Sequence, residues 1–360
     1  MKNTFGNSIA VTLFGESHGE AIGAVIDGLA PGIEVDEEKI RLYLARRRPS
    51  MATDTARKEQ DDFHIVSGVF NGKTCGTPVT ILIPNTDVRS RDYEYGPARP
   101  SHADLAAHAK YHGNEDYRGG GHFSGRITAA VVAAGGLLLP ALEKKGIRIG
   151  THIAVCADAA DRGFEDHEAD IASLQTKMFP VLDDAAGQKM IDVITAAAAD
   201  NDSVGGITET AVTGLEAGLG EPWFDSTESL IAHAVFGIGA IKGIEFGAGF
   251  GMALRRGSEA NDPIRVTDGK YHTLTNNSGG INGGLTNGMP VVFRCAVKPT
   301  PTISRPHQTV NFLTGENIEM TAKGRHDPAI IRRVCPVIDS ITAIVISDML
   351  CTRHGTDWLA

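Results

Sequence analysis

The sequence predicts a single α+β domain, and two observations carry this prediction. Strand-like segments come in pairs with short turns between them and helices between the pairs, which favours antiparallel sheets over a parallel, doubly wound sheet. Neither a low-complexity linker nor a repeat of fixed period divides the 360 residues. A chain of this length can bury its core within one large domain, so we expect one domain over residues 1–360.

The first half of the chain contains the elements with the clearest boundaries. A helix is expected from Asp36 to Arg48, because acidic residues favour a helix start and Pro49 stops the helix. Turn segments containing glycine separate the strands of each predicted pair. The predicted strands are 8–14, 22–27, 63–70 and 77–83, and the other predicted helices are 102–112 and about 124–145.

The second half of the chain begins with a change in composition. Residues 150–203 are acidic and rich in alanine, and we expect a variable, largely helical segment with a helix near 185–199. After this segment, strand-like and helical patterns alternate again. The expected elements are strands at 203–215, 237–247 and 290–297, helices at 226–236 and from about Asp327 into the 350s, and a glycine-rich loop at 276–288.

Composition excludes several classes of protein. A net charge of −10 argues against general binding to nucleic acid or to anionic membranes. The five cysteines are scattered and never spaced as Cys-x-x-Cys, which predicts neither a disulfide framework nor a metal site. The N-terminus lacks the pattern of a signal peptide, and no apolar run approaches the roughly 18 residues of a membrane helix. We therefore expect a cytoplasmic protein.

Two glycine patterns resemble nucleotide-binding motifs without matching them. In SGVFNGKT, three residues separate Gly68 from Gly72, where a phosphate-binding P-loop has four. This segment also lies between two predicted strands, so we interpret it as a hairpin turn. GIGAIKG and GAGFGMALRRG miss the Gly-x-Gly-x-x-Gly spacing, which argues against a nicotinamide-binding Rossmann unit.

Three loop segments place a histidine or an aspartate where acid–base chemistry could use it. GESHG holds His18 between glycines that let a ligand approach, although a lone histidine in a turn is more often structural. In RPSHAD, Ser101 could cap a helix, with His102 either on the surface or directed into a site. In GRHDP, Asp327 followed by proline is a common helix start, and the same carboxylate could act as a base.

Two further segments, RGGGHFSGR and LARRRP, supply backbone amides and cations. The glycine run precedes Ser124, a candidate cap, and an apolar helix, which favours an anion site at the helix start. Cations at the end of a helix complement its dipole, but consecutive residues lie about 100° apart. At least one of Arg46, Arg47 and Arg48 is therefore free to face a pocket and recruit a multiply anionic substrate.

Taken in order, the motifs resemble those of one enzyme family. The ordered series is FGESHG, RRRP, SGVFNGKTCGTP, NTD, RPSHAD, YRGGGHFSGR, AGLGEP, IKGIEFG, GGINGG, KPTPT and KGRHDP. It closely resembles chorismate synthase from about residue 5 to the final helix and is weakest over 150–203. The resemblance implies a β-α-β-α sandwich, usually a homotetramer. It implies a lyase of the shikimate pathway that converts 5-enolpyruvylshikimate 3-phosphate to chorismate by 1,4-anti elimination of phosphate, with reduced FMN required but no net redox change.

The resemblance also assigns roles to the residues at matching positions. His18 and His102 would be acids, one toward phosphate and one toward the reduced flavin, and Asp327 would help to remove the ring proton. Ser17 and Ser124 would hold this proton network in place. The implied substrate-binding residues are Arg47, Arg48, Arg126 and Arg325. The implied flavin contacts are His122, Phe123, Ser124, Gly239, Ala240, Gly283, Lys298, Pro299, Thr300, Pro301, Thr302 and Arg325.

The chain departs in three places from the family's other common form, which reads Gly-Gly-Gly-Arg-Ser-Ser-Ala-Arg in the glycine segment. His122 and Phe123 stand where that form has arginine and serine, so a fixed positive charge becomes pH-dependent. The segment after RRRP lacks a matching second arginine, which leaves Arg47 as the predicted NADP contact. Pro301 replaces a common serine in the KPT turn and removes a donor.

The residues leave the source of reduced flavin open. NADPH could reduce FMN on this chain, or a separate flavin reductase could supply it, and no segment resembles an added reductase domain. The alternative function is a flavin-dependent NADPH oxidoreductase, against which the missing Rossmann fingerprint counts. A third alternative is an anion-binding or RNA-binding protein that uses the RGGG tract, and the net charge argues against it.

Overall fold

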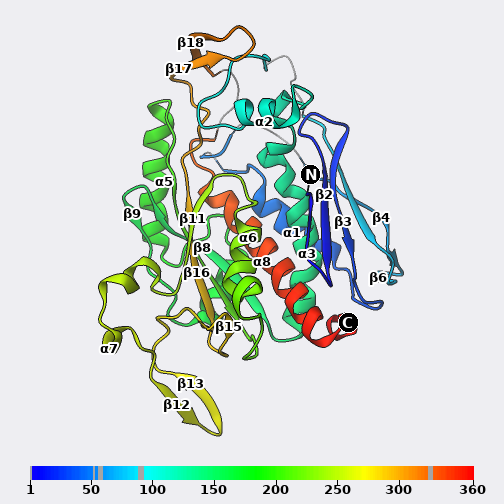
Figure 1. Ribbon diagram of the computed structural model, residues 1–360, viewed down its shortest axis with the longest axis vertical. Helices are drawn as coiled ribbons and strands as arrows, with labels where there is room; N and C mark the ends of the chain where they lie inside the picture. The colour runs from blue at the N-terminus through cyan, green and yellow to red at the C-terminus, as the bar shows by residue number, and fades with distance from the viewer. Residues whose placement is uncertain (1, 52, 56–59, 88–92, 323–326) are drawn as a thin grey trace.

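The structure is a computed structural model that describes residues 2–51, 53–55, 60–87, 93–322 and 327–360. Its main body has four layers, in the order sheet, helices, sheet and helices (Figure 1). Both large sheets are antiparallel throughout. The predicted α+β sandwich is therefore confirmed.

The first sheet forms one outer layer of the sandwich. Its strand order is β1-β2-β3-β7-β4. The strands are β1 (Thr4–Phe5), β2 (Ala10–Gly15), β3 (Ala21–Asp27), β4 (His64–Ser67) and β7 (Val79–Pro84). Along β7, buried and half-buried residues alternate, because one face of the sheet packs on the core and the other faces outward. The strands predicted at 8–14, 22–27 and 77–83 are confirmed.

The segment SGVFNGKT forms a hairpin, as predicted. Strand β5 (Val69–Phe70) pairs with β6 (Lys73–Thr74), and Asn71 and Gly72 form the two-residue turn between them. Both turn residues have positive φ, 49° and 74°, as two-residue hairpin turns of this kind require. The strand predicted at 63–70 is thus interrupted at Gly68, which also has a positive φ of 82°.

The second sheet lies inside the molecule, with helices on both faces. Its order is β11-β16-β10-β8-β9. The strands are β8 (Arg148–Cys156), β9 (Ala159–Ala160), β10 (Gly206–Thr213), β11 (Ile241–Phe246) and β16 (Val291–Val297). Helices α4 (His167–Leu174) and α5 (Asp184–Ala199) form the fourth layer beside β8 and β9. The acidic segment 150–203 therefore supplies an interior strand of the sheet as well as the predicted helix near 185–199.

The layer between the sheets consists of long helices. These are α1 (Glu37–Arg47), α3 (Thr128–Lys144) and α8 (Ile331–His354), with α6 (Thr227–Val235) beside α8 (Figure 1). Gly135 lets α3 and α8 approach closely, because a Cβ there would lie 2.3 Å from the Cβ of Ser340.

Two helical segments, Gly125–Lys144 and Ile331–His354, are long and apolar enough to cross a membrane. The expectation that no apolar run approaches this length is therefore wrong. However, 83% and 94% of the residues in their apolar windows are buried inside the protein. Helices packed between two sheets are apolar on all sides because protein surrounds them.

Two candidate helix caps do not act as caps in the structure. Helix α8 begins at Ile331, and Asp327 does not cap it, because its carboxylate accepts hydrogen bonds from the Thr55 amide and from Arg333 instead. Helix α2 (Asp104–Tyr111) begins without a side-chain cap. Ser101 lies upstream in a left-handed conformation, with φ of 59°.

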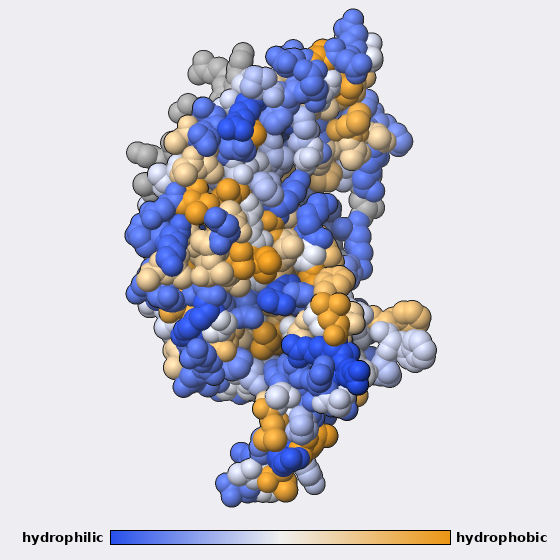
Figure 2. Space-filling model, turned by 90° about the vertical axis from the view of Figure 1, so that its left-hand side faces the viewer, coloured by the Kyte–Doolittle hydropathy of each residue, from blue (hydrophilic) through white to orange (hydrophobic). Residues whose placement is uncertain are grey.

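Three hairpins extend from the ends of the sandwich. The hairpin of β17 (Pro306–Asn311) and β18 (Glu316–Thr321) lies near α2, at the top of Figure 1. The hairpin of β12 (Ile264–Thr267) and β13 (Lys270–Thr273) forms an arm at the opposite end, and its apolar side chains are exposed (Figure 2). The small hairpin of β14 (Ile281–Asn282) and β15 (Leu285–Thr286) lies within the predicted glycine-rich loop.

Candidate active site

The glycine run of RGGGHFSGR forms the centre of the site. Gly119, Gly120 and Gly121 all have positive φ, at 62°, 85° and 54°, a conformation that favours glycine. A Cβ at Gly119 would lie 2.6 Å from Nε2 of His18, and a Cβ at Gly120 would lie 3.2 Å from Cε1 of His102. Consecutive glycines therefore let two histidines from distant segments approach the same loop.

Ser17 and His18 follow β2 and are both buried. The Ser17 amide donates a hydrogen bond to the carbonyl of Gly121 (3.1 Å). The Ser17 hydroxyl is fully buried and has no hydrogen-bond partner among the described residues. A hydroxyl buried in this way is costly unless another group pairs with it. The ring of His18 packs edge-on against that of Tyr93, with centroids 5.2 Å apart.

The residues after the glycine run point in different directions. Nδ1 of His122 lies 2.7 Å from the carbonyl oxygen of Gly15. Because a carbonyl only accepts, this nitrogen carries a proton. Phe123 is 45% exposed, whereas Ser124 accepts the Arg126 amide (3.3 Å) and caps the short 3₁₀ helix that follows, as predicted. His122 thus fastens the glycine run to the end of β2.

Two predicted substrate-binding arginines meet at one buried carboxylate. Arg47 Nη1 donates to Asp61 (2.8 Å), and Arg126 donates to the other oxygen of the same carboxylate. Burial alone would raise the pKa of Asp61, but the two guanidinium groups outweigh burial and hold this pKa below its usual range. The Asp61 carboxylate therefore holds both guanidinium groups in place.

Arg48 and Asp327 lie where the end of α1 meets the start of α8. Arg48 is half-buried and donates to a backbone carbonyl of the loop that contains Asp61. Asp327 binds the Arg333 guanidinium at 2.5 Å and the Thr55 amide at 3.0 Å. Arg333 also donates to a backbone carbonyl at the end of α1. Asp327 is therefore positioned by two protein donors.

The KPTPT turn follows β16 and is hydrogen-bonded to the loop that bears His102. The ammonium of Lys298 donates to the carbonyl of Ser101 (2.6 Å), and its amide donates to the carbonyl of Ala240 (3.0 Å). Burial, with a smaller effect of the nearby Lys242, lowers the pKa of Lys298. The same turn contains Pro299, Thr300, Pro301 and Thr302.

The remaining predicted flavin contacts are only partly brought together. Gly239 and Ala240 follow the C-terminal end of α6, close to Lys298. Gly283 lies in the β14–β15 turn, which is bonded to the N-terminal end of α6. Helix α6 has nine residues and is therefore about 13 Å long. Within one chain, Gly283 thus lies apart from the other residues, and Arg325 lies outside the described residues.

A cavity of about 570 Å³ opens beside the glycine run. This volume is within the range of small-molecule and cofactor sites. The cavity lies between α2, the glycine run and the β17–β18 hairpin. It is lined by three predicted site residues, His102, Phe123 and Thr302, and by Gly120 of the glycine run. Aromatic residues, which include Tyr93, Tyr95, Tyr117 and Phe312, also line it.

Sequence reasoning missed these aromatic residues and Asp61. The tyrosines come from the segments DYEYG and DYRGGG, and their proximity to the histidine and glycine motifs was the available signal. No local pattern identified Asp61, because it pairs with arginines 14 and 65 residues away in the sequence. Long-range ion pairs of this kind leave no periodic signal.

Together, the sandwich fold, the glycine run with its two histidines and the cavity lined by His102 define an enzyme with acid–base groups. Comparison with known proteins identifies the family. The family profile described as "Chorismate synthase" matches residues 9–351. Chorismate synthase of Pyrococcus abyssi is 44% identical over 351 residues, which cover 97% of this chain and 98% of that protein. Chorismate synthase of Archaeoglobus fulgidus is 43% identical, with 97% of each chain covered.

A solved structure supports the same relationship. A crystal structure of chorismate synthase superposes with a TM-score of 0.78 at 28% sequence identity, covering 98% of this chain and 94% of the other. The chain belongs to the chorismate synthase family.

Proposed function

We propose that this chain is a phosphate lyase that converts 5-enolpyruvylshikimate 3-phosphate to chorismate and phosphate, with reduced FMN as cofactor. The observation that carries the proposal is the glycine run, which packs against His18 at one position and His102 at the next. Two acids beside one loop suit an elimination that needs a proton for the leaving group and a second proton near the flavin. Family membership over residues 9–351 supports the same reaction.

The residues around the cavity fit a flavin. The cavity is large enough for a cofactor, and its glycine run allows close backbone approach because side chains are absent there. Two buried hydroxyls near the cavity lining, Ser17 beside Gly119 and Thr300 in the turn of Thr302, have no partners among the described residues. A group bound against the glycine run and this turn could pair with them. We propose that the glycine run, Ala240, Lys298 and Thr302 hold FMN.

Reduced FMN, when bound, supplies electron density that assists carbon–oxygen cleavage. The chain's own residues supply the protons and the positive charge. We propose that His18 and His102 donate protons and that Ser17 and Ser124 hold them in place. Asp327 accepts the ring proton in this proposal, and Arg333 and the Thr55 amide fix its orientation.

The substrate carries two carboxylates and a phosphate, which cations must balance. We propose that Arg47, Arg48, Arg126 and Arg325 provide this charge. The Arg47–Asp61–Arg126 cluster supports the proposal, because Asp61 brings two buried guanidinium groups together. Asp61 also fixes both side chains before substrate arrives, which lowers the entropic cost of binding.

We further propose a cytoplasmic homotetramer. The β12–β13 arm, where Ile264, Val266 and Tyr271 are 62–81% exposed, supports an assembly (Figure 2), because exposed apolar patches mark interaction surfaces. Gly283 would have to reach the flavin from a position remote from the other contacts in its own chain. Its role remains a prediction from the resemblance, as do those of Gly239, Pro299 and Pro301.

An anaerobic assay tests the lyase proposal. Purified protein is mixed with photoreduced FMN and 5-enolpyruvylshikimate 3-phosphate, and released phosphate is measured. Phosphate release that depends on both additions is the expected result. No release from folded protein that binds FMN would overturn the proposal.

The same assay with NADPH in place of light tests how the flavin is reduced. We propose that a separate flavin reductase supplies reduced FMN, so NADPH alone should not support turnover. Turnover with NADPH alone would instead assign reductase activity to this chain and support a nicotinamide contact at Arg47. Rapid NADPH oxidation without the phosphorylated substrate is what the alternative oxidoreductase function predicts, and family membership does not favour that function.

A further inference from the structure

We infer that Asp104, held by Arg99, is the positioning residue that orients His102 and fixes which of its ring nitrogens carries the transferable proton. The inference rests on the proposed function of His102 as an acid in the candidate site. The motif RPSHAD contains Arg99 and Asp104, but the sequence assigned a role to neither. Neither residue is needed to explain the fold of α2, whose start has no side-chain cap.

Arg99 and His102 surround the carboxylate of Asp104 with hydrogen-bond donors. Oδ1 of Asp104 lies 2.9 Å from Nδ1 of His102 and 2.6 Å from Nη2 of Arg99. Oδ2 of Asp104 accepts the Arg99 amide (2.9 Å) and Arg99 Nε (2.8 Å). Both carboxylate oxygens are thus held by donors of Arg99, and only one of them also faces the imidazole.

Electrostatics determine the direction of the bond to His102. Burial would raise the pKa of Asp104, but the hydrogen bonds from Arg99 and His102 outweigh burial and hold this pKa far below its usual range. An ionised carboxylate only accepts, so Nδ1 of His102 must be the donor. Nη2 of Arg99 lies 3.1 Å from the same Nδ1, but both are donors and both converge on Oδ1.

Nε2 is consequently the nitrogen left for chemistry. Among the described residues it has no hydrogen-bond partner, and His102 lines the cavity together with Gly120. A Cβ at Gly120 would lie 3.5 Å from this Nε2, so the glycine keeps the approach open. When the protonated ring gives its Nε2 proton to a bound group, the ring becomes neutral. It keeps the proton on Nδ1, which is hydrogen-bonded to Asp104. Solvent can then return a proton to Nε2.

The two oxygens of Asp104 make Asp104→Asn an unusually informative variant. The Oδ2 position meets two Arg99 donors, whereas the Oδ1 position meets one Arg99 donor and the imidazole. An asparagine therefore places its oxygen at the Oδ2 position and its NH₂ group against His102 Nδ1. Nδ1 must then accept, the neutral ring carries its proton on Nε2, and the imidazolium loses its anionic partner.

The test is ¹⁵N NMR of the full-length protein labelled at histidine, combined with turnover. The His102 signals are assigned by their loss in His102→Gln. We expect the Nδ1–H tautomer in the wild-type protein and the Nε2–H tautomer in Asp104→Asn. We expect kcat of Asp104→Asn to fall at least about 100-fold.

Asp116→Asn is the matched control. Asp116 also lines the cavity and binds an arginine twice, Arg118 at 2.8 Å through both Nε and Nη2. Among the described residues, the hydrogen bond of His102 to a carboxylate goes to Asp104 and not to Asp116. His102 should keep its tautomer in this variant. An Nε2–H tautomer in the wild-type protein would overturn the inference even if Asp104→Asn does not fold, and so would unchanged turnover in a folded Asp104→Asn variant. If the wild-type protein lacks lyase activity, the proposed function fails, while the tautomers still decide whether Asp104 orients the ring.

Discussion

Two histidines of this chain bind an aspartate through Nδ1, but the rest of their surroundings differ. His102 bonds Asp104 at 2.9 Å, and its Nε2 is left at the cavity. His152, on β8, bonds Asp161 through Nδ1 (3.0 Å) and Glu209 through Nε2 (3.1 Å). The His102 side chain is 19% exposed and that of His152 is 0% exposed. With both nitrogens taken, His152 can hold segments together but cannot exchange a proton with a ligand.

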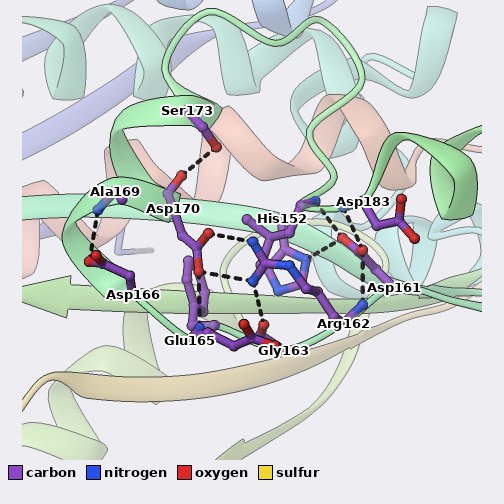
Figure 3. A network of polar contacts seen from close by, with 12 residues as sticks. His152, Asp161, Arg162, Gly163, Glu165, Asp166, Ala169, Asp170, Ser173 and Asp183 are labelled. Carbon is purple, nitrogen blue, oxygen red and sulfur yellow. Dashed lines mark hydrogen bonds and ion pairs between the residues drawn. The ribbon is translucent and has the colours of Figure 1, made fainter.

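The surroundings of His152 form a closed polar network (Figure 3). Besides His152, Asp161 accepts the amides of Leu182 and Asp183 at 2.6 and 2.9 Å. The neighbouring Arg162 binds both oxygens of Asp170 on α4. The network therefore fastens the loops around α4 to the second sheet. Its hydrogen bonds pair both ring nitrogens of His152.

A row of alternating charges extends this network across the sheet. The strand register places Glu209 on β10 opposite His152 on β8, and Arg294 on β16 opposite Glu209. Glu245 on β11 lies opposite Arg294, with an ion pair of 2.6 Å. His102 and His152 show that residue type alone does not define a catalytic histidine. What defines it is a ring nitrogen that protein groups leave unpaired.

The largest expected effect concerns His102. His102→Gln should reduce kcat about 100- to 10,000-fold, because an acid that contributes to the transition state is lost, while the melting temperature stays close to that of the wild type. Steady-state turnover, FMN titration and thermal unfolding of the same preparation measure this. Equal losses in turnover and in FMN affinity would make His102 a structural flavin contact.

His152→Gln should have the opposite profile. Removing one partner from a buried ion pair typically costs about 3–5 kcal/mol of unfolding free energy, and here two carboxylates lose their partner. Turnover per folded molecule should remain that of the wild type. Urea unfolding at a fixed protein concentration provides the measurement, and an active-site role for His152 would appear as a turnover loss in the folded fraction.

The pH dependence of stability tests whether His152 is charged in the folded protein. Burial would lower the pKa of His152, but its bonds to Asp161 and Glu209 outweigh burial and raise this pKa above the ordinary value of about 6.5. A raised pKa contributes stability that is complete below about pH 6.5 and is lost as pH rises through the folded-state value. The stability gap between the wild type and His152→Gln should therefore shrink at alkaline pH.

Unfolding free energies at several pH values check this expectation. At acidic pH the trend reverses, because the pKa values of Asp161 and Glu209 are held below their ordinary range. Their contribution is lost as pH falls through those lowered values. A gap that stays constant above pH 6.5 would show that His152 is neutral in the folded protein.

The smallest effect is expected at the far end of the charge row. Glu245→Gln breaks the ion pair with Arg294, whose side chain is 38% exposed. Solvent screens such pairs, so the loss should be below about 1 kcal/mol. Urea unfolding of Glu245→Gln beside His152→Gln measures both ends of the row. Losses of equal size would show that the row acts as one unit instead of being graded by burial.

Much of the fold could be predicted because its signals are local. The strand pair around GESHG, the hairpin at Asn71 and Gly72, and α1 with its Asp36 cap all follow from short-range patterns. The predicted Asp327 cap failed because Arg333 and the Thr55 amide, which is 272 residues away in the sequence, bind the carboxylate. A local signal cannot reveal a competing long-range partner.

The candidate site shows the same division. Separate motifs contained His18, His102 and Ser124, and the structure brings the three residues to one loop whose positive φ values favour glycine. The sequence could not distinguish the partners of a histidine. It gave no signal that Asp104 would leave Nε2 of His102 unpaired, or that Asp61 would join two arginines.

The central claim is that this chain catalyses an elimination of phosphate in which reduced FMN is required but not consumed. The most direct measurement follows chorismate and phosphate together under strict anaerobiosis, with far less reduced FMN than substrate. The account predicts complete conversion, one phosphate per chorismate, and flavin that is still reduced at the end. Product that stops at the amount of flavin supplied, or no product from folded protein with FMN bound, would contradict it.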